Sequence, residues 1–227
     1  MPDPFLGKES LLETIHFMIG HAAEMWQLFV EHAYIVGVAL VISIVTGVPI
    51  GVAITFNRKA ADTVLYIAGI IMTIPSVALF GLMIPILAPW DMGIGKVPAI
   101  IALVLYSQLP IIQNTHAAIK NIDPSIVDAG RGMGMKRFQI MWKVQIPLAL
   151  GVISAGVRVA VVMSIGIAAI AAYIGAGGLG KYIFTGISTT YDAKLFAGAI
   201  GVSVMAIVAD LVFGRLEKAL MSKGLRR

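Results

Sequence analysis

Five long stretches of this 227-residue sequence are apolar and almost free of charged side chains. A helix needs about 20 mainly apolar residues to cross the roughly 30 Å hydrocarbon core of a bilayer. The five stretches are 33–56, 63–90, 97–119, 148–174 and 195–214. Their only formal charges are Arg158 in the fourth and Asp210 in the fifth. The pattern predicts an all-α membrane protein with about five transmembrane helices, whose termini lie on opposite sides of the membrane.

The composition agrees with this prediction and excludes several other classes of protein. Hydrophobic residues make up 59% of the chain and charged residues 13%, whereas average soluble domains have ~45–50% and ~25%. The mean hydropathy is +0.92. These values exclude a soluble globular domain and a disordered chain. The sequence has no cysteine, which excludes disulfides, thiolate metal sites and cysteine nucleophiles.

The basic residues are distributed unevenly between the two sides of the predicted membrane. Twelve of the 17 Lys and Arg residues fall on one side and four on the other, with Arg158 inside a span. Cytoplasmic loops carry an excess of Lys and Arg, so the N-terminus is expected outside and the C-terminus in the cytoplasm. The net charge of +5 thus indicates orientation rather than a nucleic-acid surface. The twelve are Arg58, Lys59, Lys120, Arg131, Lys136, Arg137, Lys143, Arg215, Lys218, Lys223, Arg226 and Arg227.

The N-terminal segment 1–32 differs from the apolar domain 33–227 that follows it. Apolar residues recur in it at helical spacing, with polar residues between them. It lacks the basic start and long apolar run of a signal peptide. The spacing predicts an amphipathic helix at the outer membrane interface, or one that packs on the bundle without a function of its own. The apolar positions are Leu11, Ile15, Met18, Ala22, Trp26 and Phe29.

The segment 120–147, predicted on the cytoplasmic side, is too long for a simple connection between helices. Asp123 followed by Pro124 is a typical helix start, and Gly130, Gly132 and Gly134 favour the end of that helix. A second amphipathic helix is predicted after it, closed by Pro147, which opens the next span. A small helix with tiny residues on one face suits insertion into a groove of another protein. The alternative is a solvated loop that only connects two spans.

This segment also contains a motif of a known family. Asp128-Ala129-Gly130, then Gly134, and then Val144-Gln145-Ile146-Pro147 resemble the EAA motif of ABC-importer permeases. That motif reads Glu-Ala-Ala, three residues, Gly, nine residues, Ile-x-Leu-Pro. The chain departs from it by having Asp128 for Glu, Gly130 for the second Ala, and Val144 and Ile146 for Ile and Leu. Further stretches, 109–115, 120–124, 131–135 and 174–180, resemble the osmoprotectant branch, whose permeases take up glycine betaine, choline, carnitine and related solutes.

The resemblance implies a type I importer in a bacterial inner membrane that works by alternating access. Its partners would be ABC ATPase subunits, a second permease subunit (an identical copy or a paralogue), an external or periplasmic solute-binding protein, and the lipid bilayer. ATP and Mg would be bound by the ATPase, with no cofactor or metal on this chain. The EAA segment would form the coupling helix that docks on the ATPase. The matching residues are Asp128, Ala129, Gly130, Gly134, Val144, Ile146 and Pro147.

A second set of residues is predicted to line the translocation path or its gate. Pro75 and Pro85 are expected to interrupt the second span, and Pro110 the third, which allows bending or leaves only static kinks. Arg158 inside a span is a functional candidate by default, or a structural ion pair, whereas Asp210 is expected at the interface. The full set is Pro75, Pro110, Asn114, Arg158, Gly175, Gly177 and Gly178.

The run from Gly175 to Gly180 matches G-x-G-x-x-G but follows a membrane helix rather than a strand. Nucleotide binding is therefore not expected there, and a flexible or re-entrant turn near the external gate is predicted. The chain has no G-x-x-x-x-G-K-[ST] loop and no legible catalytic pair, which argues against an ATPase or an intramembrane enzyme. Two alternatives remain: an ABC permease for methionine or another amino acid, and a channel or secondary transporter that needs no ATPase.

Overall fold

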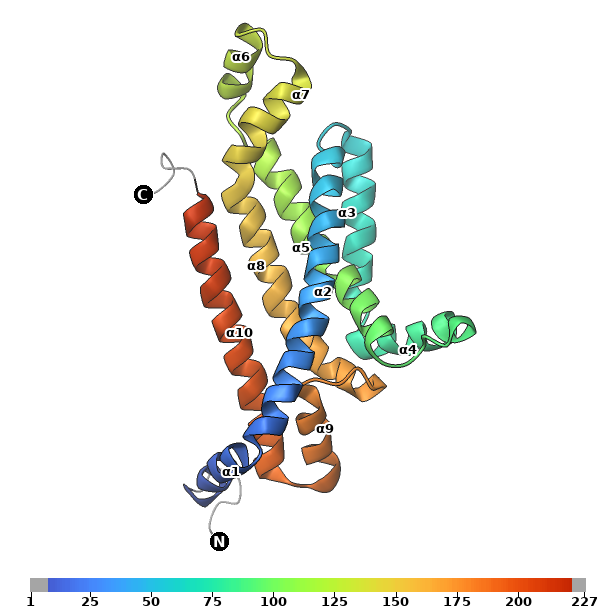
Figure 1. Cartoon of the computed structure of the whole chain (residues 1–227). Coiled ribbons are helices and arrows are strands. Elements are labelled where there is room, and N and C mark those ends of the chain that lie inside the picture. The colour runs from blue at the N-terminus through green and yellow to red at the C-terminus, as the bar shows by residue number, and fades with distance from the viewer. Residues whose placement is uncertain (1–7, 222–227) are drawn as a thin grey trace. The chain divides into compact units, whose positions relative to one another are not determined.

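The computed structural model describes residues 8–221, and within that range every regular element is a helix. The all-α prediction is therefore confirmed. The elements, shown in Figure 1, are α1 (Lys8–Gly20), α2 (Ala22–Ile54), α3 (Arg58–Thr73), α4 (Ser76–Leu87), η1 (Ala88–Trp90), α5 (Lys96–Lys120), α6 (Pro124–Gly132), α7 (Arg137–Ile140), η2 (Met141–Gln145), α8 (Ile146–Ala171), η3 (Ala172–Ile174), α9 (Gly180–Thr189) and α10 (Asp192–Leu220).

Four runs of helix in the described range are long and apolar enough to cross a membrane. They are α2, α5, Arg137–Ile174 and α10. The helices α3 and α4 pass the same test only as a pair. Counting that pair as one span gives up to five, as the sequence predicted.

Proline breaks one of the predicted spans and leaves two helices intact. The backbone of Pro75 is extended (φ −56°, ψ 136°) and caps the N-terminus of α4, so the stretch 63–90 is divided at Ile74 and Pro75. Pro85 lies inside α4 and Pro110 inside α5, and neither ends its helix. A break in the helix is therefore found only at Pro75, and bending at Pro85 and Pro110 stays a prediction.

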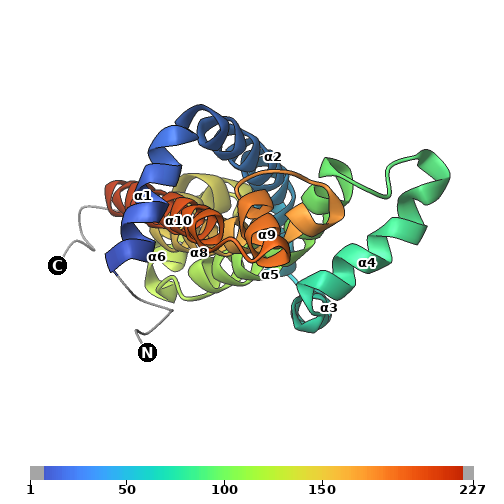
Figure 2. The same cartoon turned by 90° about the horizontal axis from the view of Figure 1, so that it is seen from below.

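The chain forms two compact units, and α2, α5, α8 and α10 contribute residues to both. Unit 1 comprises Met1–Ala39, Ile74–Val104 and Val162–Val208. In it the ring of Phe17 from α1 contacts the rings of Tyr182 and Tyr191, each at a centroid distance of 5.5 Å. The helix α9 lies beside the first turns of α10 (Figures 1 and 2), where Gly186 and Gly198 permit the close approach.

Residues of the predicted N-terminal segment fall into two helices of unit 1. A turn at His21 separates α1 from α2, and residues 22–32 continue directly into the first membrane-length helix. The amphipathic stretch is thus divided between α1 and the beginning of α2. Residues 1–7 of this segment, and Lys223, Arg226 and Arg227 from the charge comparison, lie outside the described residues.

Unit 2 comprises Leu40–Thr73, Leu105–Val161 and Ala209–Arg227. Its helices α2 and α5 approach closely at two glycines: a Cβ on Gly51 would lie 2.6 Å from Cβ of Thr115, and one on Gly47 2.9 Å from Cγ2 of Ile111. Small residues allow such contacts between membrane helices, where no hydrophobic driving force exists. Ile54, Ala61 and Ile112 join α2, α3 and α5 in a buried cluster nearby.

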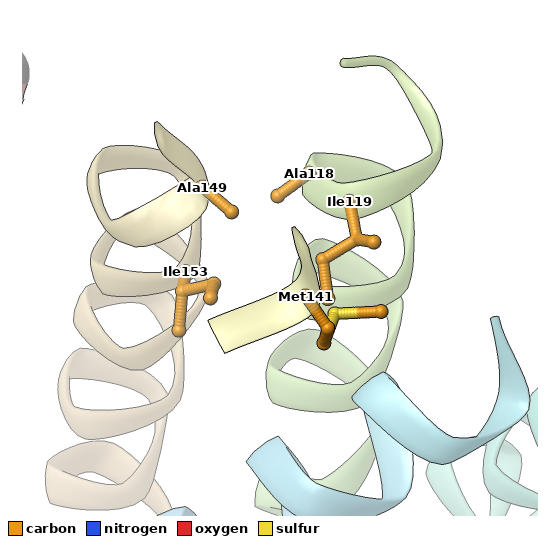
Figure 3. Close-up of a cluster of buried hydrophobic side chains, with 5 residues drawn as sticks. All are labelled: Ala118, Ile119, Met141, Ala149 and Ile153. Carbon is orange, nitrogen blue, oxygen red and sulfur yellow. The ribbon is translucent and has the colours of Figure 1, made fainter. Parts of the chain in front are cut away.

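A second buried cluster of unit 2 connects the segment 120–147 to two membrane helices. Figure 3 shows Ala149 and Ile153 pointing from α8 toward α5, where Ala118 and Ile119 lie, with Met141 of η2 beside them. Val48, Val52 and Ile146 pack against this group. The segment is thereby packed against the ends of α5 and α8 (Figure 1).

Candidate functional site

The segment 120–147 begins with a capped helix, α6. The carboxylate of Asp123 accepts a hydrogen bond from the backbone N–H of Ser125 at 2.8 Å, and Pro124 occupies the first helical position. This hydrogen bond stabilises the charged form and lowers the pKa of Asp123. The predicted helix start is therefore confirmed, and local sequence explains it.

The end of α6 is closed by a Schellman motif centred on Gly134. The N–H of Met135 donates to the carbonyl of Gly130 at 3.1 Å, and the N–H of Gly134 to that of Arg131 at 2.9 Å. This is the paired pattern of that motif, in which the residue after the cap adopts a left-handed conformation. Gly134 has φ +78°, a conformation that glycine adopts without strain.

The four residues matching the first part of the EAA motif do not share one environment. Asp128 is exposed and pairs with Arg131 at 3.0 Å, and Ala129 and Gly134 are also exposed. Gly130 is buried instead, and a Cβ there would lie 3.2 Å from Cγ1 of Ile140. Three of the four are therefore available to a partner, while Gly130 lets α6 pack on α7.

The rest of the motif lies where α7 continues into α8. Residues 141–145 form the π-helical turn η2, and α8 begins at Ile146. Val144 and Ile146 are half-buried and Pro147 is exposed. The run is continuous from Arg137 to Ile174, so the prediction that Pro147 closes a separate second helix is wrong.

Large exposed apolar side chains on the segment were not recognised as surface residues from the sequence. Met133 is 74% exposed, Phe138 73% and Trp142 55%. The rings of Phe138 and Trp142 contact each other at 5.8 Å. Four-residue spacing between Phe138 and Trp142 is the signal that could have placed them on one face, opposite the buried Ile140.

A cavity of about 450 Å³ lies between α6, α7 and the ends of α2 and α5, all in unit 2. Its walls include Lys120, Asp128, Arg131 and Arg137. The guanidinium of Arg137 lies 4.6 Å from the ring centroid of Phe56. The segment therefore has a mixed surface, with basic groups next to apolar side chains.

Arg158, predicted as either a path residue or a structural pair, joins α8 to α10 within unit 2. Its Nε and Nη2 donate to the two carboxylate oxygens of Asp210 at 2.6 and 2.8 Å, and Nη1 donates to Glu217 at 3.2 Å. A Cβ on Gly214 would lie 3.2 Å from Cζ of Arg158, so glycine makes room for the guanidinium. Asp210, expected at the interface, is the bidentate partner of Arg158, and its side chain stays 40% exposed.

The other predicted path residues are divided between the units. Pro110, Asn114 and Arg158 belong to unit 2, and Pro75 and the glycines 175, 177 and 178 to unit 1. The Asn114 amide donates to the carbonyl of Pro110 at 2.8 Å, opposite Gly156 of α8. All three glycines of the turn have positive φ, between +78° and +86°, which accounts for the glycine content of the turn.

Membrane-length helices, one broken helix pair and a capped helical segment between two spans indicate a multi-pass membrane protein. A solved structure supports this at the level of the fold: a chain of the inward-facing MetNI methionine ABC transporter matches with a TM-score of 0.78 at 24% identity, covering 90% of this chain and 98% of that one. Among the described residues no group of three or more His, Cys, Asp or Glu could hold a metal ion.

The chain belongs to the family described as binding-protein-dependent transport system inner membrane component, whose model matches residues 39–222. It is a permease subunit of an ABC importer, as the resemblance implied. It is 46% identical over 215 residues to the osmoprotectant import permease protein OsmW of Salmonella typhimurium, covering 95% of this chain and 100% of that protein. It is 41% identical to the glycine betaine/carnitine/choline permease protein OpuCB of Bacillus subtilis, covering 86% and 88%.

Proposed function

We propose that this chain is the permease subunit of an ATP-driven importer that takes up osmoprotectants such as glycine betaine, carnitine or choline through a bacterial inner membrane. The observation that carries the proposal is the 46% identity to an osmoprotectant permease over nearly the whole chain. A second permease subunit, an external binding protein and ATPase subunits would complete the transporter. The ATPase subunits would bind ATP and Mg, since this sequence has no phosphate-binding loop of the Walker type.

The segment 120–147 is the proposed point at which the ATPase acts on this subunit. Its helix α6 is capped at both ends, so it can move as a rigid piece. Ile140 packs under Gly130, and Met141 lies in the cluster with Ala118 and Ala149. A displacement of α6 would thereby be transmitted to α5 and α8 within unit 2.

The proposed contact surface is the exposed side of α6 and its C-terminal turn. Ala129 and Met133 supply apolar contact on this side, and Ala129 has only a small side chain that permits close approach. The Asp128–Arg131 pair adds polar groups on the same exposed helix. An apolar centre bordered by polar groups is typical of protein interfaces.

A pair of methionine substitutions tests this surface. Met133→Glu is expected to reduce co-purification of the ATPase at least about tenfold, because an unpaired carboxylate would be desolvated at the contact. Met92→Glu is the matched control, since Met92 is also exposed but lies in unit 1. Equal co-purification by both variants would contradict the proposed docking surface.

Uptake into vesicles that contain the assembled transporter tests the cargo. Labelled glycine betaine is expected to accumulate with purified binding protein and ATP, while labelled methionine is not. Methionine accumulation without betaine accumulation would favour the amino-acid alternative instead. The MetNI match supports only the fold, because its identity is 24%.

A further inference from the structure

The glycine-rich turn between η3 and α9 has no role in the function proposed above. Its backbone is left-handed at Gly175, Gly177 and Gly178, and glycines of this kind can turn successive N–H groups toward one side. Such concave backbone arrays bind anions. In this protein the anion comes from the chain itself.

The anion is the carboxylate of Glu31, near the beginning of α2. The N–H of Gly178 donates to Oε2 of Glu31 at 3.0 Å. A Cβ on Gly177 would overlap the same carboxylate, so the glycine is needed for its approach. The other oxygen, Oε1, lies 2.7 Å from Nζ of Lys96 at the start of α5. Each oxygen of Glu31 therefore binds a different segment.

The next residue of α2, His32, also packs against the turn. Its side chain is 1% exposed, and its Nε2–H donates to the carbonyl of Ile165 in α8 at 3.0 Å. A Cβ on Gly178 would lie 3.1 Å from Nδ1 of His32. The turn therefore contacts two consecutive residues of α2, Glu31 and His32.

Residues before α5 complete the attachment. The N–H of Gly95 donates to the carbonyl of Ile174 at 2.9 Å. A Cβ on Gly175 would lie 3.3 Å from Cγ2 of Ile94. Residues 94–96 therefore contact residues 174–178 directly through the backbone and indirectly through Glu31, all within unit 1.

We propose that Glu31 is the positioning residue of this turn: it clamps residues 175–178 to α2 and to the start of α5, so that the three segments move as one body during transport. The inference rests on the proposed function only in assigning that movement to a transport cycle. The sequence predicts a flexible or re-entrant turn here, and the clamp argues against a flexible one. The clamp also accounts for Gly177 and Gly178 in the G-x-G-x-x-G run.

The absence of native cysteine makes a direct test feasible. Ala176→Cys places a thiol at a position that is 0% exposed, and its labelling by a maleimide reports opening of the turn in the assembled transporter. Adding Glu31→Ala is expected to raise the labelling rate about tenfold or more, because a charge-assisted hydrogen bond and an ion pair are both lost. Lys96→Met, which removes the ion pair alone, is expected to give a smaller increase.

Two controls separate positioning from general destabilisation. Tyr173→Cys, on a side chain already 71% exposed, is expected to label at the same rate with and without Glu31→Ala. Glu13→Gln, an exposed carboxylate of α1, should leave the labelling of Cys-substituted Ala176 unchanged. If Glu31→Ala leaves that labelling unchanged as well, the clamp is wrong.

Betaine uptake by the same Glu31→Ala transporter is expected to fall in parallel with the increase in labelling, and unimpaired uptake despite fast labelling would overturn the link to transport. The labelling needs neither solute nor ATP. Fast labelling in a transporter whose unsubstituted form does not take up betaine would therefore reject the proposed function and retain the clamp.

Discussion

Glycine serves two different purposes within α6 and the turn that follows it. Gly134 is favoured by its backbone, with φ +78° and no neighbour within 4 Å of an added Cβ, whereas Gly130 is favoured by packing, because a Cβ there would lie 3.2 Å from Cγ1 of Ile140. The motif spacing identified both positions. It could not distinguish them, because the burial of Gly130 depends on how α7 folds back over α6.

Gly134→Ala tests the backbone requirement. Alanine in the left-handed region costs about 1–2 kcal/mol, so the end of α6 should loosen and ATPase-driven uptake should fall. The matched control is Gly132→Ala, which is helical and also has nothing within 4 Å of its added Cβ. Uptake assays and ATPase co-purification of both variants provide the measurement, and equal loss in both would contradict the assignment.

Gly134→Arg should leave the protein inserted in the membrane but uncouple transport from the ATPase.

The sequence shows that Arg158 needs a partner or water, but it does not show which residue the partner is. An arginine in a span must be paired or hydrated, yet Asp210 and Glu217 are distant in the sequence and meet it only because α8 and α10 lie together. The structure favours the structural alternative for this side chain over a place in the path.

A charge exchange tests the Arg158 pair. Arg158→Asp is expected to lower the thermal stability of the detergent-solubilised protein, because it places three carboxylates together. Adding Asp210→Arg should restore much of the loss by re-forming the pair with reversed polarity. Thermal unfolding of both single variants and the double variant measures this, and strictly additive losses would show that the two residues are not coupled.

At the level of elements, α6 and the presence of a helix after it were predictable from sequence, and the end of that second helix was not. The Asp123-Pro124 start and the glycine end of α6 are local signals. Met141 of the π-helical turn η2 is instead buried in the cluster with Ala118 and Ala149, a contact that no local pattern reports. Pro147 therefore gave a wrong boundary.

Asp123→Ala is expected to fray the first turn of α6 and reduce coupling, whereas Asp123→Ser should retain most of it, because serine also caps helices. The pKa of Asp123 is lowered in the folded protein. Its carboxylate therefore stabilises α6 fully at pH values above the ordinary pKa of aspartate. This stabilisation is lost as the pH falls through the lowered pKa. Hydrogen exchange of the Ser125 and Ile126 amides measures the fraying. Equal protection in Asp123→Ala and the parent would contradict the capping role.

At the scale of the whole molecule, hydropathy was enough to predict the fold class and the number of spans. The arrangement of helices that pairs Arg158 with Asp210, or Glu31 with the glycine turn, depends on contacts between residues more than 50 positions apart and was not available from the sequence. Charge bias remains the basis for the predicted orientation.

Single cysteines test that orientation in intact bacterial cells. Met133→Cys is expected to resist a membrane-impermeant maleimide in cells and to react in inverted vesicles, because residues 120–147 are predicted on the cytoplasmic side. Tyr173→Cys should show the opposite pattern. Labelling of Met133→Cys from outside would place the segment on the wrong side for an ATPase.

The most direct test of the account is betaine uptake in vesicles as a function of the ATPase. With the binding protein supplied, accumulation is predicted only when the ATPase subunits and ATP are both present, and it should be abolished by Met133→Glu but not by Met92→Glu. Uptake at the same rate with no ATPase attached would contradict the claim that a separate motor drives this permease through the segment 120–147.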